Sequence, residues 1–192
     1  MKKHIALGIL GVSLFGIAGA AQAAPDRVGH LELGGQAGIA LDSRIDDGAY
    51  AQINLDWGVT PYVALGVEGG WYEASGSSPD ETVGVVHILG DIIVRSPDFH
   101  DSIVPYGILG LGVVGAYVED TDGNAPNNNG ADSYGSSFAW KLGAGIEWLF
   151  HPNWALNLEL AYFGTSVDLP NTTVGDDGID HWKLGGGIKY IF

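Results

Sequence analysis

Apolar residues alternate with small or polar residues along most of the chain after residue 24, with the period of two that is typical of β-strands. The alternation is clearest where Phe138, Trp140, Leu142, Ala144 and Ile146 are separated by Ala, Lys or Gly. No segment has the period of an amphipathic helix. The pattern predicts eight strands, at Gly29–Leu41, Ala49–Trp57, Tyr62–Tyr72, Thr82–Arg95, Val104–Glu119, Ser136–Phe150, Trp154–Ser166 and Ile179–Phe192. The fifth strand is apolar on both faces, so its register stays open.

The connections between these strands alternate in length. The long, polar links are Asp42–Gly48, Glu73–Glu81, Asp120–Gly135 and Val167–Gly178, and the mostly shorter ones are Gly58–Pro61, Ser96–Ile103 and His151–Asn153. Long loops at one end and short turns at the other are typical of transmembrane barrels, in which the short turns face the periplasm. We therefore expect an all-β fold, an eight-stranded antiparallel up-and-down transmembrane β-barrel.

The first 23 residues have the composition of a secretory signal peptide. Lys2 and Lys3 precede an apolar stretch, Ile5–Ala18, and Ala21-Gln22-Ala23 forms a cleavage site. The apolar stretch is too short to cross a membrane as a helix. We expect residues 1–23 to be removed and residues 24–192 to form the barrel. The chain contains no Cys, which argues against disulfides, thiolate metal sites and a lipoprotein anchor.

The tryptophans indicate which face of the strands is outward. All six lie on the apolar face near strand ends: Trp71, Trp140 and Trp182 toward the long loops, and Trp57, Trp148 and Trp154 toward the short turns. An indole is apolar but carries a hydrogen-bond donor, so it concentrates at the two interfaces of a membrane. The apolar face is therefore predicted to contact lipid, which favours a membrane barrel over a soluble lipocalin-like barrel.

The opposite face carries most of the charged residues of the strands. A lysine facing lipid would cost about 2–4 kcal/mol near the bilayer midplane, so these side chains should point into the lumen. The interior of an eight-stranded barrel is just wide enough for side chains to fill. We expect a lumen charge network with a structural role, formed by Glu68, Asp91, Arg95, Lys141, Glu147, Glu159, Lys183 and Lys189. His87 and Asp91, two lumen positions apart on one strand, are expected to form a hydrogen-bonded pair.

The net charge of −15 arises largely in the long loops. An acidic surface excludes nucleic acid and would meet lipopolysaccharide phosphates only through divalent cations. Asp120, Asp122 and Asn124 have the spacing of the start of a calcium loop, but Ala125 and Ala131 stand where an EF-hand needs Gly and Glu. We expect weak Ca²⁺ or Mg²⁺ association at most, no built metal site and no cofactor.

Candidate catalytic residues are few. Ser166, Asp180 and His181 lie near the same outer rim and contain the residue types of a hydrolase triad. Ser and His are common in polar loops by chance, and neither the His–Ser pairing of lipid A deacylase barrels nor a trace of palmitoyltransferase barrels is recognisable. The sequence therefore favours a protein that is not an enzyme.

The chain ends with Gly187-Ile188-Lys189-Tyr190-Ile191-Phe192, a glycine followed by alternating hydrophobic or aromatic residues up to a terminal Phe. With strand phrases such as Val104-Pro105-Tyr106-Gly107 and Trp140-Lys141-Leu142-Gly143, it resembles the small outer-membrane β-barrel proteins of Gram-negative bacteria, the broad OmpA/OmpW-type superfamily. The resemblance implies that Gly187, Tyr190 and Phe192 belong to an assembly signal read by the barrel-assembly machinery. Gly185 departs from the family pattern, which usually has a polar residue there.

The resemblance implies a location, the cell outer membrane, and an architecture, but no activity. We expect a monomeric, non-enzymatic barrel that contacts outer-membrane lipid and lipopolysaccharide and contributes to envelope structure or surface interaction. A narrow channel for small or apolar solutes and a lipid-modifying enzyme are the alternatives. A dry, paired lumen favours the first function, a continuous path favours the second, and a Ser–His contact at the rim favours the third.

Overall fold

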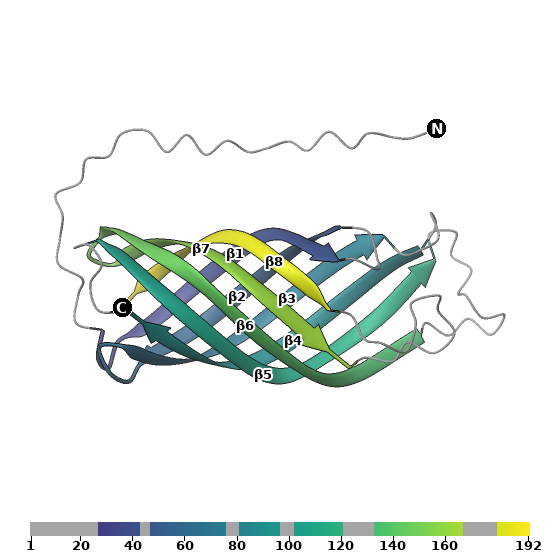
Figure 1. Cartoon of the computed structure of the whole chain (residues 1–192), viewed down its shortest axis with the longest axis horizontal. Helices are drawn as coiled ribbons and strands as arrows, with labels where there is room; N and C mark the ends of the chain where they lie inside the picture. Colours follow the sequence, from purple (N-terminus) through teal and green to yellow (C-terminus); the bar gives the residue numbers. More distant parts are fainter. Residues whose placement is uncertain (1–26, 43–46, 76–80, 97–101, 121–132, 167–179) are drawn as a thin grey trace.

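The computed structural model describes residues 27–42, 47–75, 81–96, 102–120, 133–166 and 180–192. The strands in these ranges are β1 (Leu31–Asp42), β2 (Gly48–Gly58), β3 (Val63–Ser75), β4 (Glu81–Arg95), β5 (Ile103–Asp120), β6 (Ser133–His151), β7 (Trp154–Thr165) and β8 (His181–Ile191). Each strand pairs antiparallel with its sequence neighbours, and β1 pairs with β8 (Figure 1). The predicted closed eight-stranded barrel is therefore confirmed. The expected signal peptide, residues 1–23, lies outside the described residues. Among those described, no helix is long and apolar enough to cross a membrane.

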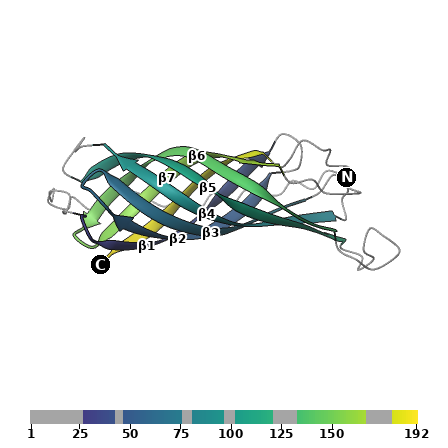
Figure 2. The ribbon, with the colours of Figure 1, turned by 90° about the horizontal axis from the view of Figure 1, so that it is seen from below.

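The barrel is elongated (Figure 2), and its two ends are distinguished by the length of the links between the strands. β1, β3, β5 and β7 run toward the end that we call the loop end, because the four long links follow these strands in the sequence. The opposite end, the turn end, carries the end of β8 and the turn from β2 to β3. In that turn, Thr60 Oγ1 accepts hydrogen bonds from the backbone amides of Tyr62 and Val63, at 3.2 and 2.9 Å.

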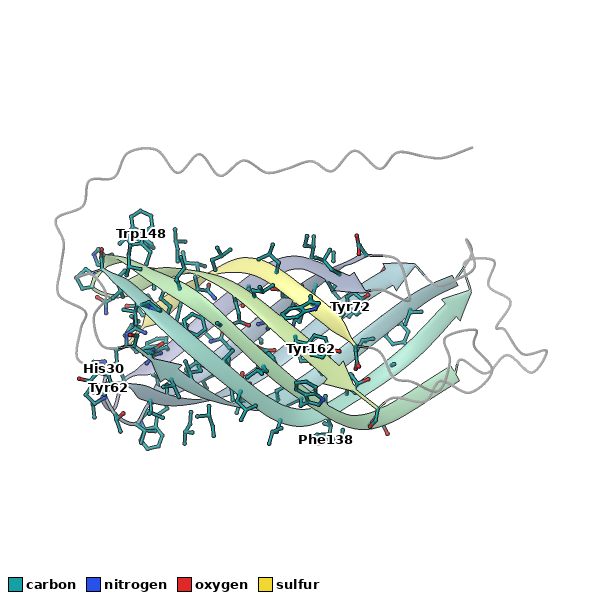
Figure 3. All side chains as sticks on the ribbon, viewed as in Figure 1. His30, Tyr62, Tyr72, Phe138, Trp148 and Tyr162 are labelled. Atoms are coloured by element: carbon teal, nitrogen blue, oxygen red, sulfur yellow. The ribbon has the colours of Figure 1, made fainter. Side chains whose placement is uncertain are left out.

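Side chains alternate between the lumen and the outer surface along every strand. Five of the six tryptophans are exposed on the outer surface, and Trp148 is half-buried there. In Figure 3, His30, Tyr62 and Trp148 lie at the turn end, whereas Phe138, Tyr72 and Tyr162 lie toward the loop end. Leucine, isoleucine and valine cover the outer surface between them, for example at Ile53, Val67, Ile88, Val113, Leu142 and Leu158. The outer surface is thus an apolar belt.

The structure decides the register of β5, which the sequence left open. Tyr106, Ile108 and Val114 are buried in the lumen, whereas Leu109 and Leu111 are exposed outside. Both faces of β5 are apolar because this strand contributes to apolar layers inside the barrel as well as to the belt outside.

These inner apolar layers were not predicted. Near the loop end the lumen is filled by Ala40, Tyr50, Tyr72, Val83, Val85, Leu89, Val114, Ala116, Ala139 and Phe163. Near the turn end, Val104, Leu149, Ala155 and Ile191 form a smaller buried cluster. The lumen is therefore polar mainly in its middle part. Across a narrow barrel, inward side chains touch one another rather than water, so they need not be polar.

Candidate functional site: the charged lumen

The eight charged residues expected in the lumen all face it, and none is more than 6% exposed. They come from five strands, β3, β4, β6, β7 and β8, on which alternate residues point inward. Glu32 on β1, Asp56 on β2 and Arg27 before β1 join them. Together these side chains form two clusters, one above the other along the barrel axis.

The central cluster consists of Lys141 and Lys183 with Glu68, His87, Asp91 and Glu159. Lys141 Nζ lies 2.5 Å from Glu68 Oε2, 3.3 Å from Asp91 Oδ2 and 3.9 Å from Glu159 Oε1. Carboxylates from three different strands therefore surround one ammonium group that has no solvent exposure. A charge buried to this degree persists only when it is paired and hydrogen-bonded.

Lys183 connects the central cluster to the apolar layer near the loop end. Its Nζ donates to Gln52 Oε1 at 2.5 Å and lies 3.7 Å from Glu68 Oε1. The same ammonium is 4.6 Å from the ring centre of Tyr50 and 5.5 Å from that of Phe163, which adds cation–π attraction. The polar and apolar parts of the lumen are thus packed against each other.

His87 contacts Glu68 rather than Asp91. The distance from His87 Nε2 to Glu68 Oε1 is 3.1 Å, whereas Asp91 contacts Lys141. The expected His87–Asp91 pair was therefore wrong. Four residues along one strand separate Cα atoms by about 13 Å, too far for a hydrogen bond between these side chains. Glu68 reaches His87 because it lies on the neighbouring strand, opposite Leu89.

The basal cluster lies toward the turn end and consists of Arg27, Arg95 and Lys189 with Glu32, Asp56 and Glu147. Lys189 Nζ lies 2.8 Å from both Asp56 Oδ2 and Glu147 Oε1. Arg95 Nη2 donates to Glu32 Oε2 at 2.6 Å. The three cationic side chains match the three carboxylates in number, so the formal charge of this cluster is balanced.

Sequence analysis missed Arg27. Its Nη1 donates to Glu147 Oε2 at 2.5 Å and lies 3.4 Å from Glu32 Oε1, and its side chain is buried. Gly29, with a φ of +79°, allows the backbone to turn here, and its amide donates to the carbonyl of Gly58 at 2.8 Å. The available signal was that Arg27 is the one Lys or Arg between the expected cleavage site and β1.

A small cavity lies between the two clusters. It is lined by Gln36, Gln52, Asn54, Asp56, Glu68, Asp91, Ile93, Tyr106, Ile108, Asn157, Glu159 and Lys189. The cavity has a volume of about 20 Å³, which suffices for about one water molecule. Tyr106 Oη donates to Glu159 Oε2 at 2.9 Å in its wall. The cavity is a gap in a packed interior rather than a solute-sized pocket.

The three candidate triad residues engage different partners. Ser166 Oγ lies 2.6 Å from Ser137 Oγ at the loop end. Asp180 Oδ1 accepts a hydrogen bond from the Thr165 amide at 2.9 Å. His181 is buried in the lumen, where its ring stacks on Tyr72 and Phe163 with centroids 4.7 and 5.1 Å apart.

The structure does not describe the side chains of the three candidate calcium ligands. Asp122 and Asn124 lie outside the described residues, as does the side chain of Asp120. Within the described ranges, no three His, Asp or Glu side chains are grouped so that they could hold a metal ion.

The expected assembly signal forms an aromatic cluster at the turn end. The rings of Trp154, Tyr190 and Phe192 stack edge to face, with neighbouring centroids 4.8 Å apart. The Phe192 amide donates to the Leu31 carbonyl at 2.9 Å, which ties the end of β8 to β1. Gly187 faces the lumen side, where a Cβ would lie 2.6 Å from Asn157 Oδ1.

The sequence profile of the family described as "Outer membrane protein beta-barrel domain" matches residues 8–192. The chain belongs to this family. This protein is therefore located in the bacterial outer membrane. Its apolar belt contacts lipid there. No curated protein matches the chain in sequence.

Solved outer-membrane barrels have the same fold. Neisserial surface protein A (NspA) superimposes with a TM-score of 0.64 at 17% identity, covering 85% of this chain and 96% of that one. The N-terminal barrel domain of Pseudomonas aeruginosa OprF gives 0.54 at 14% identity, covering 86% and 98%. OprG from the same organism gives 0.54 at 14% identity, covering 89% and 99%. At these identities the likeness establishes the fold alone.

Proposed function

We propose that this protein is a non-enzymatic, monomeric outer-membrane barrel with a closed lumen, which contributes to envelope structure and to contact with outer-leaflet lipid, including lipopolysaccharide. The observation that carries this proposal is the complete burial of Lys141 among Glu68, Asp91 and Glu159 in the middle of the barrel. These side chains fill the cross-section of the lumen and contact one another across it. Apolar clusters pack on both sides of them along the barrel axis.

Barrel size supports the same conclusion. Open aqueous channels occur in barrels of about 16–18 strands, whereas side chains fill the interior of barrels of about eight. Breaking a buried ion pair to admit water and ions is costly, because it leaves a charge without its partner. The two clusters therefore act as internal cross-links between strands.

Planar bilayer recording tests the proposal. Purified monomer should give no steady conductance of porin size, while a 16-stranded porin in the same bilayer serves as the positive control. Steady porin-sized conductance that is unaffected by Lys141→Ala or Glu147→Gln would overturn the closed-lumen function.

A narrow passage for small or apolar solutes is the second candidate, because the cavity between the clusters, with room for about one water molecule, interrupts the packing of the lumen at mid-height. Liposome efflux of a small neutral solute and of a small apolar solute separates the two functions. A passage predicts efflux that rises with protein content, whereas a closed barrel predicts the background rate of empty liposomes.

The enzymatic alternative finds little support in the rim geometry. The Ser166 hydroxyl is engaged by Ser137, and His181 is buried between aromatic rings.

For assembly, we propose that the barrel-assembly machinery reads the C-terminal strand through Tyr190 and Phe192. Phe192 remains 59% exposed at the turn end, where another protein can reach it.

A further inference from the structure

Three aromatic side chains on consecutive strands form one outward patch near the loop end. Trp140 lies on β6, Tyr162 on β7 and Trp182 on β8; we call them the aromatic patch. The ring centres of Trp140 and Tyr162 are 5.4 Å apart, and those of Tyr162 and Trp182 are 5.2 Å apart. Figure 3 shows Tyr162 on the front of the barrel, on the middle strand of the three.

Trp140 is held flat against the barrel wall. A Cβ at Gly164 on β7 would lie 2.5 Å from Trp140 Cε2 and Nε1, so the indole covers this glycine directly. One face of the ring therefore rests on the backbone and the other points away from the barrel. Trp140 remains 37% exposed and Trp182 49% exposed, so the patch presents fixed aromatic surface to the surroundings.

A carboxylate borders the patch on its loop-end side. Tyr162 Oη donates to Asp180 Oδ2 at 3.3 Å, and the Thr165 amide donates to Asp180 Oδ1 at 2.9 Å. The amide fixes the orientation of the carboxylate. Aromatic rings next to an oriented hydrogen-bond acceptor suit a ligand with apolar C–H faces and hydroxyl groups.

A residue at the membrane interface does not have to belong to a cluster of aromatic rings, as Trp71 shows. Trp71 lies near the same end on β3, which is diametrically opposite β7 in an eight-stranded closed barrel. Its cross-strand neighbours are Ala51 and Val86, and it is 39% exposed. A single tryptophan thus marks the membrane interface on one side, whereas three packed rings occupy the other.

The position of the patch limits what can cover it. It lies at the loop end of the apolar belt, which in barrels of this type is the level of the outer-leaflet headgroups. All five Lys and Arg residues of the described ranges are buried in the lumen, so none of them is available there to bind a phosphate. The chemistry of the patch therefore favours sugar over phosphate.

We propose that the aromatic patch binds the sugar headgroup of an outer-leaflet glycolipid. A pyranose ring stacks its C–H face on Trp140 or Trp182, and a sugar hydroxyl donates to Asp180. This deepens the proposed function by giving the lipid contact a site and a chemical class, and it rests on that function only for its membrane setting.

Native mass spectrometry of the folded protein tests the site. The protein is reconstituted in nanodiscs that contain phosphatidylethanolamine and dephosphorylated lipid A, a glucosamine disaccharide lipid without phosphate, and the retained lipids are counted. We expect the wild type to retain the glycolipid preferentially. Trp182→Leu should reduce this preference about fivefold, because one stacking contact of roughly 1 kcal/mol is lost while the apolar surface remains. Asp180→Asn should also reduce the preference for the glycolipid relative to the wild type, because the acceptor for the sugar hydroxyl loses its charge.

Trp71→Leu is the matched control and should leave the preference unchanged. Trp140→Leu is a second patch variant, and a shift in gel mobility on heating verifies that each variant is folded. Equal retention of both lipids by the wild type, or equal losses in the Trp71 and Trp182 variants, would overturn the proposal. Dimers that Trp182→Leu dissociates would overturn it too, by assigning the patch to a second copy. The conductance measurement above is independent of these outcomes.

Discussion

The ring of Tyr50 on β2 packs against Gly185 on β8, across the intervening strand β1. Gly38 lies between them, opposite Tyr50 in one strand pair and opposite Gly185 in the other. A Cβ at Gly185 would collide with the Tyr50 hydroxyl oxygen, and one at Gly38 would lie 2.8 Å from Tyr50 Cε1. The two glycines form a seat for the tyrosine. This explains why Gly185 stands where the family pattern usually has a polar residue.

Substitution at Gly185 should therefore destabilise the barrel. Gly185→Val places methyl groups where the Tyr50 ring lies, and we expect the free energy of unfolding to fall by about 1–3 kcal/mol, as for other overpacked interiors. Gly186→Val is the control, because Gly186 faces outward and a Cβ there would have only the Asn157 carbonyl within 4 Å, at 3.4 Å. Urea titration in micelles, followed by tryptophan fluorescence, measures both. Equal effects of the two changes would contradict the seat.

Removal of the Lys141 side chain should lower the free energy of unfolding more than Gly185→Val does. Lys141→Ala leaves Glu68 and Asp91 without their shared cation in a buried setting, so we expect a loss of about 3–5 kcal/mol in the free energy of unfolding. Asp47→Asn, at an exposed carboxylate, should change stability little. The same urea titration compares them. A near-neutral Lys141→Ala would show that water reaches the central cluster and that the lumen is more open than we propose.

Arg27 should lock the turn end of the lumen. Arg27→Ala removes a guanidinium from Glu147 and Glu32, although Lys189 still contacts both carboxylates. We expect a loss of about 3 kcal/mol, at the lower end of the range for broken buried pairs. Arg27→Lys should recover part of it, because a point charge keeps the attraction but loses the planar fork. If Arg27→Lys were as unstable as Arg27→Ala, the geometry of the guanidinium contacts with Glu147 and Glu32, rather than the positive charge alone, would hold this end closed.

The C-terminal aromatic residue should matter for assembly in the cell rather than for stability. Phe192→Ala should lower the amount of folded protein in the outer membrane severalfold, while refolding of the purified chain into detergent proceeds normally. Phe150→Ala is the control, since Phe150 is an exposed aromatic residue at the same end that lies outside the C-terminal strand. Heat-modifiability on gels of outer-membrane fractions reports the folded amount. A refolding defect in detergent would assign Phe192 to structure instead.

Much of the architecture follows from local pattern. Alternation determined the strands to within three residues of their ends, and link lengths determined the up-and-down order, because each strand must bury one face and expose the other. The same alternation put Lys141, Lys183 and Glu147 on the inner face, since the outer positions of those strands carry uncharged residues, mostly aromatic or aliphatic. Charges cannot be left in lipid, so the sequence alone determined which side faces inward.

Tertiary structure decided which inward residues meet. His87 pairs with Glu68 rather than Asp91, Arg27 enters the lumen from outside the strands, and Tyr50 reaches Gly185 across β1. These contacts depend on the stagger between strands and on barrel closure, which bring Arg27 to Glu147, 120 positions away in the sequence. The period of two specifies a face but not a height along the axis. Register and closure fix that height, and they arise only when all eight strands pack together.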